Sequence, residues 1–235
     1  MWRYVAPAFE GTHRVILFDH VGSGQSDLTA FDSQKYSSLH GYATDVLEIC
    51  RELVLRNLTF VGHSVSAMIG ILAAAREPTL FENLVLVGPS PAYINEGEYI
   101  GGFERKDIEE MLDVLDSNYL GWAGNMAPLI IGNSDRPELA HELTNSFCRT
   151  DPEIARHFAR TTFLSDNRAD LSKVKTRSLI LQCSEDVIAP ESVGRYVHQQ
   201  LPNSTLVLMK ATGHCPNLSA PEETIDAIRG FLGET

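Results

Sequence analysis

The chain has 235 residues, of which 43% are hydrophobic and 21% charged, which fits a folded domain and excludes a disordered or low-complexity chain. Its 19 basic and 31 acidic residues give a formal net charge of −12 at pH 7, which argues against a nucleic-acid-binding protein, because that class needs a basic surface. The sequence has no apolar run long enough to span a bilayer and opens with no secretory signal. We therefore expect a cytoplasmic protein with no membrane partner.

Five short apolar runs predict the strands of a parallel sheet, because strands buried on both faces are nearly continuously apolar. They are residues 14–18, 58–61, 84–87, 178–182 and 205–209. Segments with helical periodicity separate most of them, such as the stripe of Tyr42, Val46 and Ile49. The alternation of strands and helices predicts a doubly wound α/β fold.

The alternation is interrupted between residues 92 and 168, where the pattern predicts helices and no strand. Ile108, Leu112 and Leu115 share one helical face, and Asp151-Pro152 is a typical helix start. We expect one domain over residues 1–235, with a core of 1–91 and 169–235 and an inserted helical cap of 92–168 over the carboxyl ends of the strands.

Ser64 is the predicted nucleophile. It follows the apolar run 58–61 and precedes a helical segment, in the sequence Gly62-His63-Ser64-Val65-Ser66. This resembles the G-x-S-x-G turn that exposes a serine between a strand and a helix, with Ser66 in place of the last glycine. The same turn aims the backbone N–H of Val65 at an oxyanion, whereas the simpler interpretation is a tight turn with a solvent-facing serine.

Asp186 and His214 complete a predicted Ser-Asp-His triad. Each follows one of the last two predicted strands, in the order acid then histidine that this type of site requires. Ser64 would attack an acyl carbon, His214 would take and return the proton, and Asp186 would orient the imidazole. Taken singly, a loop acid or a loop histidine is usually a surface residue, but three partners at three strand ends, in the required order, favour a catalytic site.

The elbow and several other segments resemble the RsbQ-type hydrolases of the α/β-hydrolase fold and their plant relatives, the karrikin and strigolactone receptors. In that family a small residue other than glycine commonly follows the elbow. The matching segments beyond the triad are Asp19-His20-Val21-Gly22-Ser23-Gly24, Val87-Gly88-Pro89-Ser90-Pro91, Gly101-Gly102-Phe103-Glu104 and Asn118-Tyr119-Leu120-Gly121-Trp122. The resemblance covers essentially the whole chain and is greatest to the RsbQ-type hydrolases.

The resemblance implies a slow serine hydrolase of small apolar esters, lactones or related acyl compounds. The expected substrate pocket is lined by Tyr93, Phe103, Trp122 and Phe163, each of which could equally be ordinary cap core, and Ile188, two residues after Asp186, could also face the ligand. The alternative is a ligand-sensing signalling protein, which in bacteria would act in stress sigma-factor regulation through a PAS-domain phosphatase.

No cofactor or metal is expected. The segment Gly22-Ser23-Gly24 begins like a dinucleotide-binding loop, but Asp27 occupies the place of the third glycine. We expect this loop to shape the rim of the active site, and His63 to be structural. The histidines outside the triad and the widely spaced Cys50, Cys148, Cys183 and Cys215 show no metal-ligand spacing.

The start of the sequence lacks a loop that the resemblance leads us to look for. An oxyanion hole on this fold takes a second N–H from a loop after the third strand, often marked His-Gly, and none precedes Ser64 here. In the family that loop and three strands precede a helix that resembles residues 2–9. We therefore expect N-terminal strands to be missing, Met1 to be an internal methionine of a longer natural protein, and hydrolysis by this chain to be weak.

Overall fold

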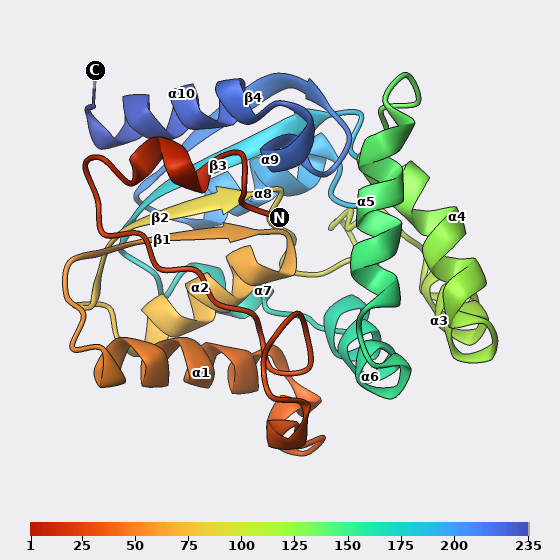
Figure 1. Cartoon of the computed structure of the whole chain (residues 1–235). Helices are drawn as coiled ribbons and strands as arrows, with labels where there is room; N and C mark the ends of the chain where they lie inside the picture. The colour runs from red at the N-terminus through yellow and green to blue at the C-terminus, as the bar shows by residue number, and fades with distance from the viewer. Residues whose placement is uncertain (235) are drawn as a thin grey trace.

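The computed structural model describes residues 1–234 and has a parallel four-stranded sheet at its centre (Figure 1). The strands follow one another in space in the order β1-β2-β3-β4, and each pairs in parallel with the next. Because parallel neighbours run the same way, all four carboxyl ends lie at one edge of the sheet. The strands are β1 (Leu58–His63), β2 (Phe81–Val87), β3 (Arg177–Ser184) and β4 (Ser204–Thr212).

The central strands are buried on both faces, as their sequences predict. In β2, Leu84 and Leu86 pack into one hydrophobic cluster, whereas Val85 and Val87 pack into another on the opposite face. The first cluster is covered by helices α1 (Leu39–Glu52), α2 (Val65–Arg76), α7 (Arg168–Leu171) and α8 (Glu191–Gln200), and the second by α10 (Pro221–Leu232) and the short helix η1 (Ala6–Phe9). This is an α/β fold with helices on both faces of the sheet.

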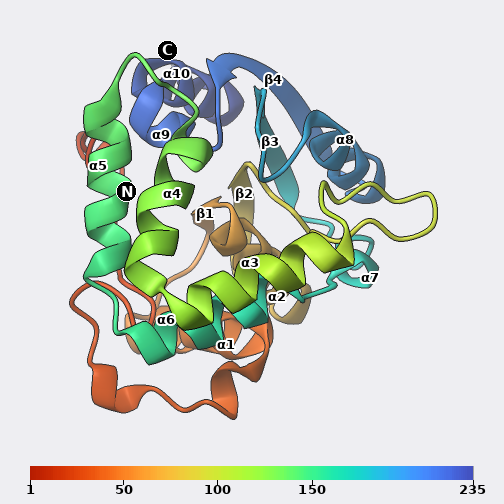
Figure 2. The same ribbon diagram turned by 90° about the vertical axis from the view of Figure 1, so that its right-hand side faces the viewer.

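Four helices form a cap beyond the carboxyl ends of the strands (Figures 1 and 2). They are α3 (Arg105–Ser117), α4 (Tyr119–Ile131), α5 (Pro137–Cys148) and α6 (Pro152–Phe163). The cap has its own hydrophobic cluster, in which Ile108, Leu112 and Trp122 take part. Between residues 92 and 168 the structure has isolated β-bridges and no strand, which confirms a helical cap region.

Shorter helices complete the chain. The turn-like helices η2 (Leu28–Ala30) and η3 (Lys35–Ser37) precede α1, and α9 (Pro216–Ser219) follows β4. Asp151 begins α6 as the sequence predicts, because its carboxylate accepts the backbone N–H groups of Glu153 and Ile154 at 2.9 and 3.2 Å.

The predicted strand at residues 14–18 is wrong. This segment forms no ladder, and β1 is therefore one of the two edge strands of the sheet, with β4 at the other edge. Leu17 and Phe18 remain 63% and 40% exposed, so the run is not buried on two faces as its apolar sequence suggested. The physical reason is that a strand needs a neighbour to pair with its backbone, and no strand in residues 1–234 lies beside this one.

Candidate active site

Ser64 occupies the sharp turn between β1 and α2. Its φ of 56° and ψ of −124° lie outside the regions that side chains normally favour, and its N–H donates to the Val87 carbonyl at 2.7 Å. Gly62 makes the turn possible, because a Cβ there would lie 2.6 Å from the Ser66 carbonyl oxygen. The strained backbone thus presents the serine side chain beyond the end of the strand.

His214 lies between Ser64 and Asp186 at hydrogen-bond distance from both. Its Nε2 is 2.7 Å from the Ser64 hydroxyl, and its Nδ1 is 2.7 Å from Oδ2 of Asp186. Asp186 and His214 are buried, at 5% and 3% exposure. The three residues follow β1, β3 and β4, so the carboxyl edge of the parallel sheet brings together positions far apart in the sequence.

The surroundings of Asp186 keep its carboxylate charged. Burial favours the neutral form, but the charge and hydrogen bond of His214 outweigh it and hold the pKa below its usual value. The backbone N–H groups of Ile188 and Ala189 add to this effect, donating to Oδ1 at 2.9 and 3.0 Å. A carboxylate fixed in this way accepts the Nδ1–H of His214, which leaves Nε2 free to accept the proton of the serine.

His63 makes a hydrogen bond to the backbone of His214. Its Nε2 lies 2.7 Å from the carbonyl oxygen of His214, and since a carbonyl only accepts, this nitrogen carries the proton. Burial, followed by repulsion from His214, lowers the pKa of His63 to about 3. His63 thus stays neutral and donates to the backbone, which fits the structural role that the sequence predicts for it.

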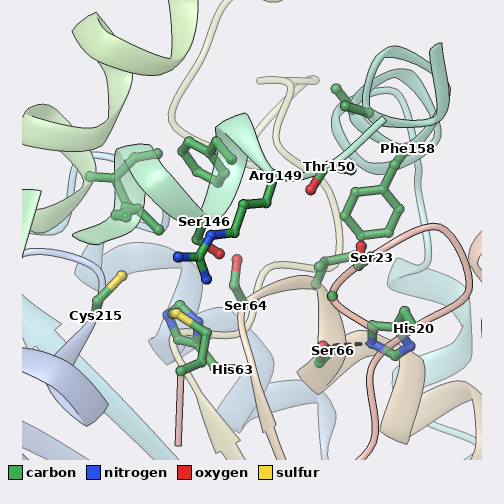
Figure 3. A pocket seen from close by; sticks show the side chains of 18 of the residues that line it. His20, Ser23, His63, Ser64, Ser66, Ser146, Arg149, Thr150, Phe158 and Cys215 are labelled. Carbon is green, nitrogen blue, oxygen red and sulfur yellow. Dashed lines mark hydrogen bonds between the residues drawn. The ribbon is translucent and has the colours of Figure 1, made fainter. Parts of the chain in front are cut away.

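The loop at residues 19–24 lies along the active site. His20, Val21, Ser23 and Gly24 line the cavity beside Ser64, as expected for a rim segment. His20 shares a hydrogen bond of 3.0 Å with the Ser66 hydroxyl, which joins this loop to the first turn of α2 (Figure 3). Burial lowers the pKa of His20, so this contact is made by a neutral ring.

A cavity of about 1330 Å³ extends from Ser64 beneath the cap. Val65 begins α2 beside Ser64, where the first N–H groups of a helix have no partner within it, and it also lines the cavity. Of the predicted pocket residues, Tyr93, Trp122, Phe163 and Ile188 line this cavity, whereas Phe103 does not. Phe103 packs against the cap cluster instead, and its backbone N–H donates to the Tyr93 carbonyl at 3.1 Å.

Sequence reasoning missed several lining residues on the cap helices α3 to α6 and on the turn between α5 and α6. They include Leu115, Tyr119, Ser146, Phe147, Arg149, Thr150 and Phe158. Leu115 and Tyr119 are four residues apart and could have been found from spacing, although a kink at Asn118 separates their helices. Nothing in the sequence signals that Ser146 and Arg149, at the end of α5, reach the cavity.

The described residues contain no group of three or more His, Cys, Asp or Glu side chains placed to hold a metal ion. Likewise, none of the helices in residues 1–234 has the length and apolar character needed to cross a membrane.

Comparisons with known proteins agree with this fold and geometry. The chain is 37% identical over 229 residues to the karrikin insensitive 2 receptor IA of Petunia hybrida, and the matched residues cover 97% of this chain and 84% of the relative. It is 38% identical over 232 residues to a strigolactone esterase of Arabidopsis thaliana, covering 98% and 86%. The solved structure of a hydrolase from Oleispira antarctica is 42% identical and superposes with a TM-score of 0.96, covering 100% of this chain and 86% of that one.

These matches confirm the resemblance to the plant receptors and esterases, while the greater likeness to RsbQ-type hydrolases stays a prediction. Residues 1–227, nearly the full chain, match the family described as "Alpha/beta hydrolase family". With a parallel sheet, a helical cap, and a serine, a histidine and an aspartate in contact at the strand ends, this chain belongs to the α/β-hydrolase family and is a hydrolytic enzyme.

Proposed function

We propose that the protein is a serine hydrolase in which Ser64, His214 and Asp186 form the catalytic triad. The observation that carries this proposal is the unbroken chain of two 2.7 Å contacts from the serine through the histidine to the aspartate. A nucleophile, its base and the group that orients the base then have the mutual geometry that acyl transfer needs.

The geometry supports a two-step reaction. As the Ser64 oxygen forms a bond to the carbonyl carbon of an ester or lactone, its proton passes to Nε2 of His214. The charged imidazole is stabilised by Asp186, and it returns the proton to the departing alkoxide oxygen. A water molecule then gives a proton to His214 as its oxygen attacks the acyl carbon; the bond to the Ser64 oxygen breaks, the acid is released, and His214 returns the proton to Ser64.

The reaction also needs a hydrogen-bond donor that stabilises the negative charge developing on the carbonyl oxygen. The N–H of Val65, at the positive end of α2, is the donor that this proposal assigns to it. The substrate class is a small acyl compound with an apolar part, because Tyr93, Trp122, Phe163 and Ile188 give the cavity beneath the cap a largely apolar wall. We also propose that residues 92–168 form the cap that covers this cavity.

Turnover of short 4-nitrophenyl esters tests the proposed chemistry. We expect Ser64→Ala to lower kcat at least roughly 10³-fold, because the variant lacks the nucleophile. Ser117→Ala is the matched control, since Ser117 lies in the cap with its hydroxyl bonded to the Val114 carbonyl and outside the cavity. Equal rates for Ser64→Ala and Ser117→Ala would refute the triad.

A second function, ligand sensing, is favoured by a specific observation. Relatives at 36–37% identity are named karrikin insensitive 2 receptors, and they match this chain over nearly its full length. In this alternative the cap reports occupancy of the cavity to a protein partner, and the partner we propose is a PAS-domain phosphatase, with turnover slow or absent.

Affinity capture separates the two functions. If sensing is the main function, a PAS-domain phosphatase from the native host is retained by the wild-type protein, and a ligand in the cavity changes the amount retained. Ser64→Ala should still bind the ligand and the partner but lack hydrolysis. Capture that does not respond to ligand would count against sensing.

A further inference from the structure

Arg149 places a positive charge at the cavity that contains Ser64. It immediately follows α5 and lines the cavity together with Ser146 and Thr150. Figure 3 shows its side chain extending from the end of the helix toward Ser64. Arg3 also lines the cavity but is paired with Glu142, so among the described lining residues Arg149 is the arginine whose charge has no carboxylate partner.

The guanidinium of Arg149 has no ion pair or hydrogen bond to any group in residues 1–234. Three acidic residues also line the cavity, namely Asp19, Glu138 and Glu142. Glu142 pairs with Arg3, and Asp19 accepts the backbone N–H of Gln25 at 2.9 Å, so two of these carboxylates have partners of their own. Arg149 therefore keeps its donors available for a ligand.

Four other residues that line the cavity, His20, Tyr42, Trp122 and Thr162, have a buried side-chain N or O atom with no hydrogen-bond partner within residues 1–234. These atoms include the indole nitrogen of Trp122 and the hydroxyl oxygen of Thr162, which both carry a donor proton. Buried donors are rarely left without an acceptor, because losing water without a replacement is unfavourable. A ligand with several oxygen acceptors would supply what these side chains lack.

We propose that the substrate is an acyl compound that carries a carboxylate, which Arg149 binds while Ser64 attacks the ester or lactone carbonyl. The inference rests on the proposed hydrolase function and names its substrate class. The chain has a net charge of −12, which disfavours the approach of an anion, and the local charge of Arg149 would offset that repulsion at the cavity. Arginine suits this task, since its planar donors match the two oxygens of a carboxylate.

Matched substrates test the proposal. Methyl hexanoate is compared with the monomethyl esters of succinate, glutarate and adipate, which carry a carboxylate at different distances from the reacting carbonyl. Acid release is followed by titration, with kcat and KM determined separately. We expect at least one monoester to have the higher kcat/KM, and Arg149→Met to lower that value about 10-fold while leaving methyl hexanoate within about 2-fold.

Two control variants separate a local contact from other effects. Arg105→Met removes the same charge from the exposed start of α3, outside the cavity, and should leave the preference for the monoester unchanged. Arg149→Lys keeps the charge but not the paired donors, and should retain part of the preference. Equal losses in Arg149→Met and Arg105→Met would overturn the proposal, as would an equal loss for charged and neutral esters.

A binding measurement keeps this inference separate from the hydrolase proposal. Calorimetric titration of Ser64→Ala with monomethyl glutarate and with free glutarate needs no turnover, and it distinguishes a bound ester from a bound free acid. We expect the ester to bind and the double variant Ser64→Ala, Arg149→Met to bind it about 10-fold more weakly. Equal affinity in the two variants would overturn the carboxylate site even if Ser64 is shown to be the nucleophile.

Discussion

Two backbone positions at the active site are held in the left-handed region by their neighbours. Ser64 has a φ of 56°, and Glu185, directly before Asp186, has a φ of 53°. Such conformations cost about 1–3 kcal/mol each for residues other than glycine. The strain lies immediately at the proposed nucleophile and beside the proposed acid, where the direction of a side chain matters more than local stability.

Asp186→Asn should abolish most activity without unfolding the protein. Asparagine is similar in size, but its amide favours the wrong tautomer of His214 and no longer stabilises the charged imidazole, so we expect kcat to fall roughly 10⁴-fold. Hydrolysis of 4-nitrophenyl esters, with thermal melting as the check on folding, measures this. Glu185→Gln changes the neighbouring charge and serves as the control, and a loss of less than 10-fold in Asp186→Asn would contradict the proposed role.

At the same scale, the chemistry of the site could be predicted and the shape of its pocket could not. Ser64, Asp186 and His214 follow three predicted strands in the required order, and the parallel sheet brings such positions together whatever lies between them. Phe103 and Arg149 depend on how cap helices pack, which no local pattern encodes. Phe103 is not part of the cavity wall, whereas Arg149 extends toward Ser64.

At the scale of elements, α6 depends on its first residue. The carboxylate of Asp151 accepts two backbone N–H groups, and α6 carries Phe158 and Phe163 to the wall of the cavity. The helix also reaches the segment before α1, since Nε2 of His157 lies 3.0 Å from the Tyr36 carbonyl oxygen.

Asp151→Ala should lower the free energy of unfolding by about 1 kcal/mol, because two donors at the helix start lose their acceptor. Urea denaturation followed by circular dichroism measures the change. Asp107→Ala, in the first turn of α3 but not at its cap position, is the control and should have the smaller effect. Equal destabilisation by the two substitutions would show that the cap hydrogen bonds do not contribute.

Elements were predicted well where burial and pairing agree. The sequences of β2 and β3 are apolar throughout because two helical layers cover them. Residues 14–18 carry a similar pattern without a strand beside them, so the same apolar signal produced no strand. An apolar run indicates that a segment tends to be buried. To form a strand, the segment also needs backbone hydrogen-bond partners from other segments.

For the whole molecule, the lowered pKa values of His63 and His20 predict loss of stability in acid. The unfolded chain binds protons on these rings near pH 6.5, whereas folded His63 does so only near pH 3. The unfolded state thus gains protons first, and the free energy of unfolding falls as the pH drops from about 6.5 toward 3, by at most about 1.4 kcal/mol per unit for His63. Asp186, with a lowered pKa, adds a further loss below about pH 4.

Urea midpoints measured between pH 7.5 and 4.5 test this expectation. The wild-type midpoint should decrease over that interval, and His63→Gln, which keeps a donor for the His214 carbonyl but does not titrate, should show a weaker dependence. An identical pH dependence in the two proteins would show that His63 does not contribute to it.

The carboxyl end of α4 is bonded to the loop that carries His214. The His214 N–H donates to the Ile130 carbonyl at 2.8 Å, and a Cβ on Gly213 would lie only 2.0 Å from the Ile131 carbonyl oxygen. If this end of α4 moved away from the sheet, it would either break this hydrogen bond or displace His214 from Ser64. We therefore expect any ligand that shifts this end of α4 to move His214 relative to Ser64 and so to alter the reactivity of the serine.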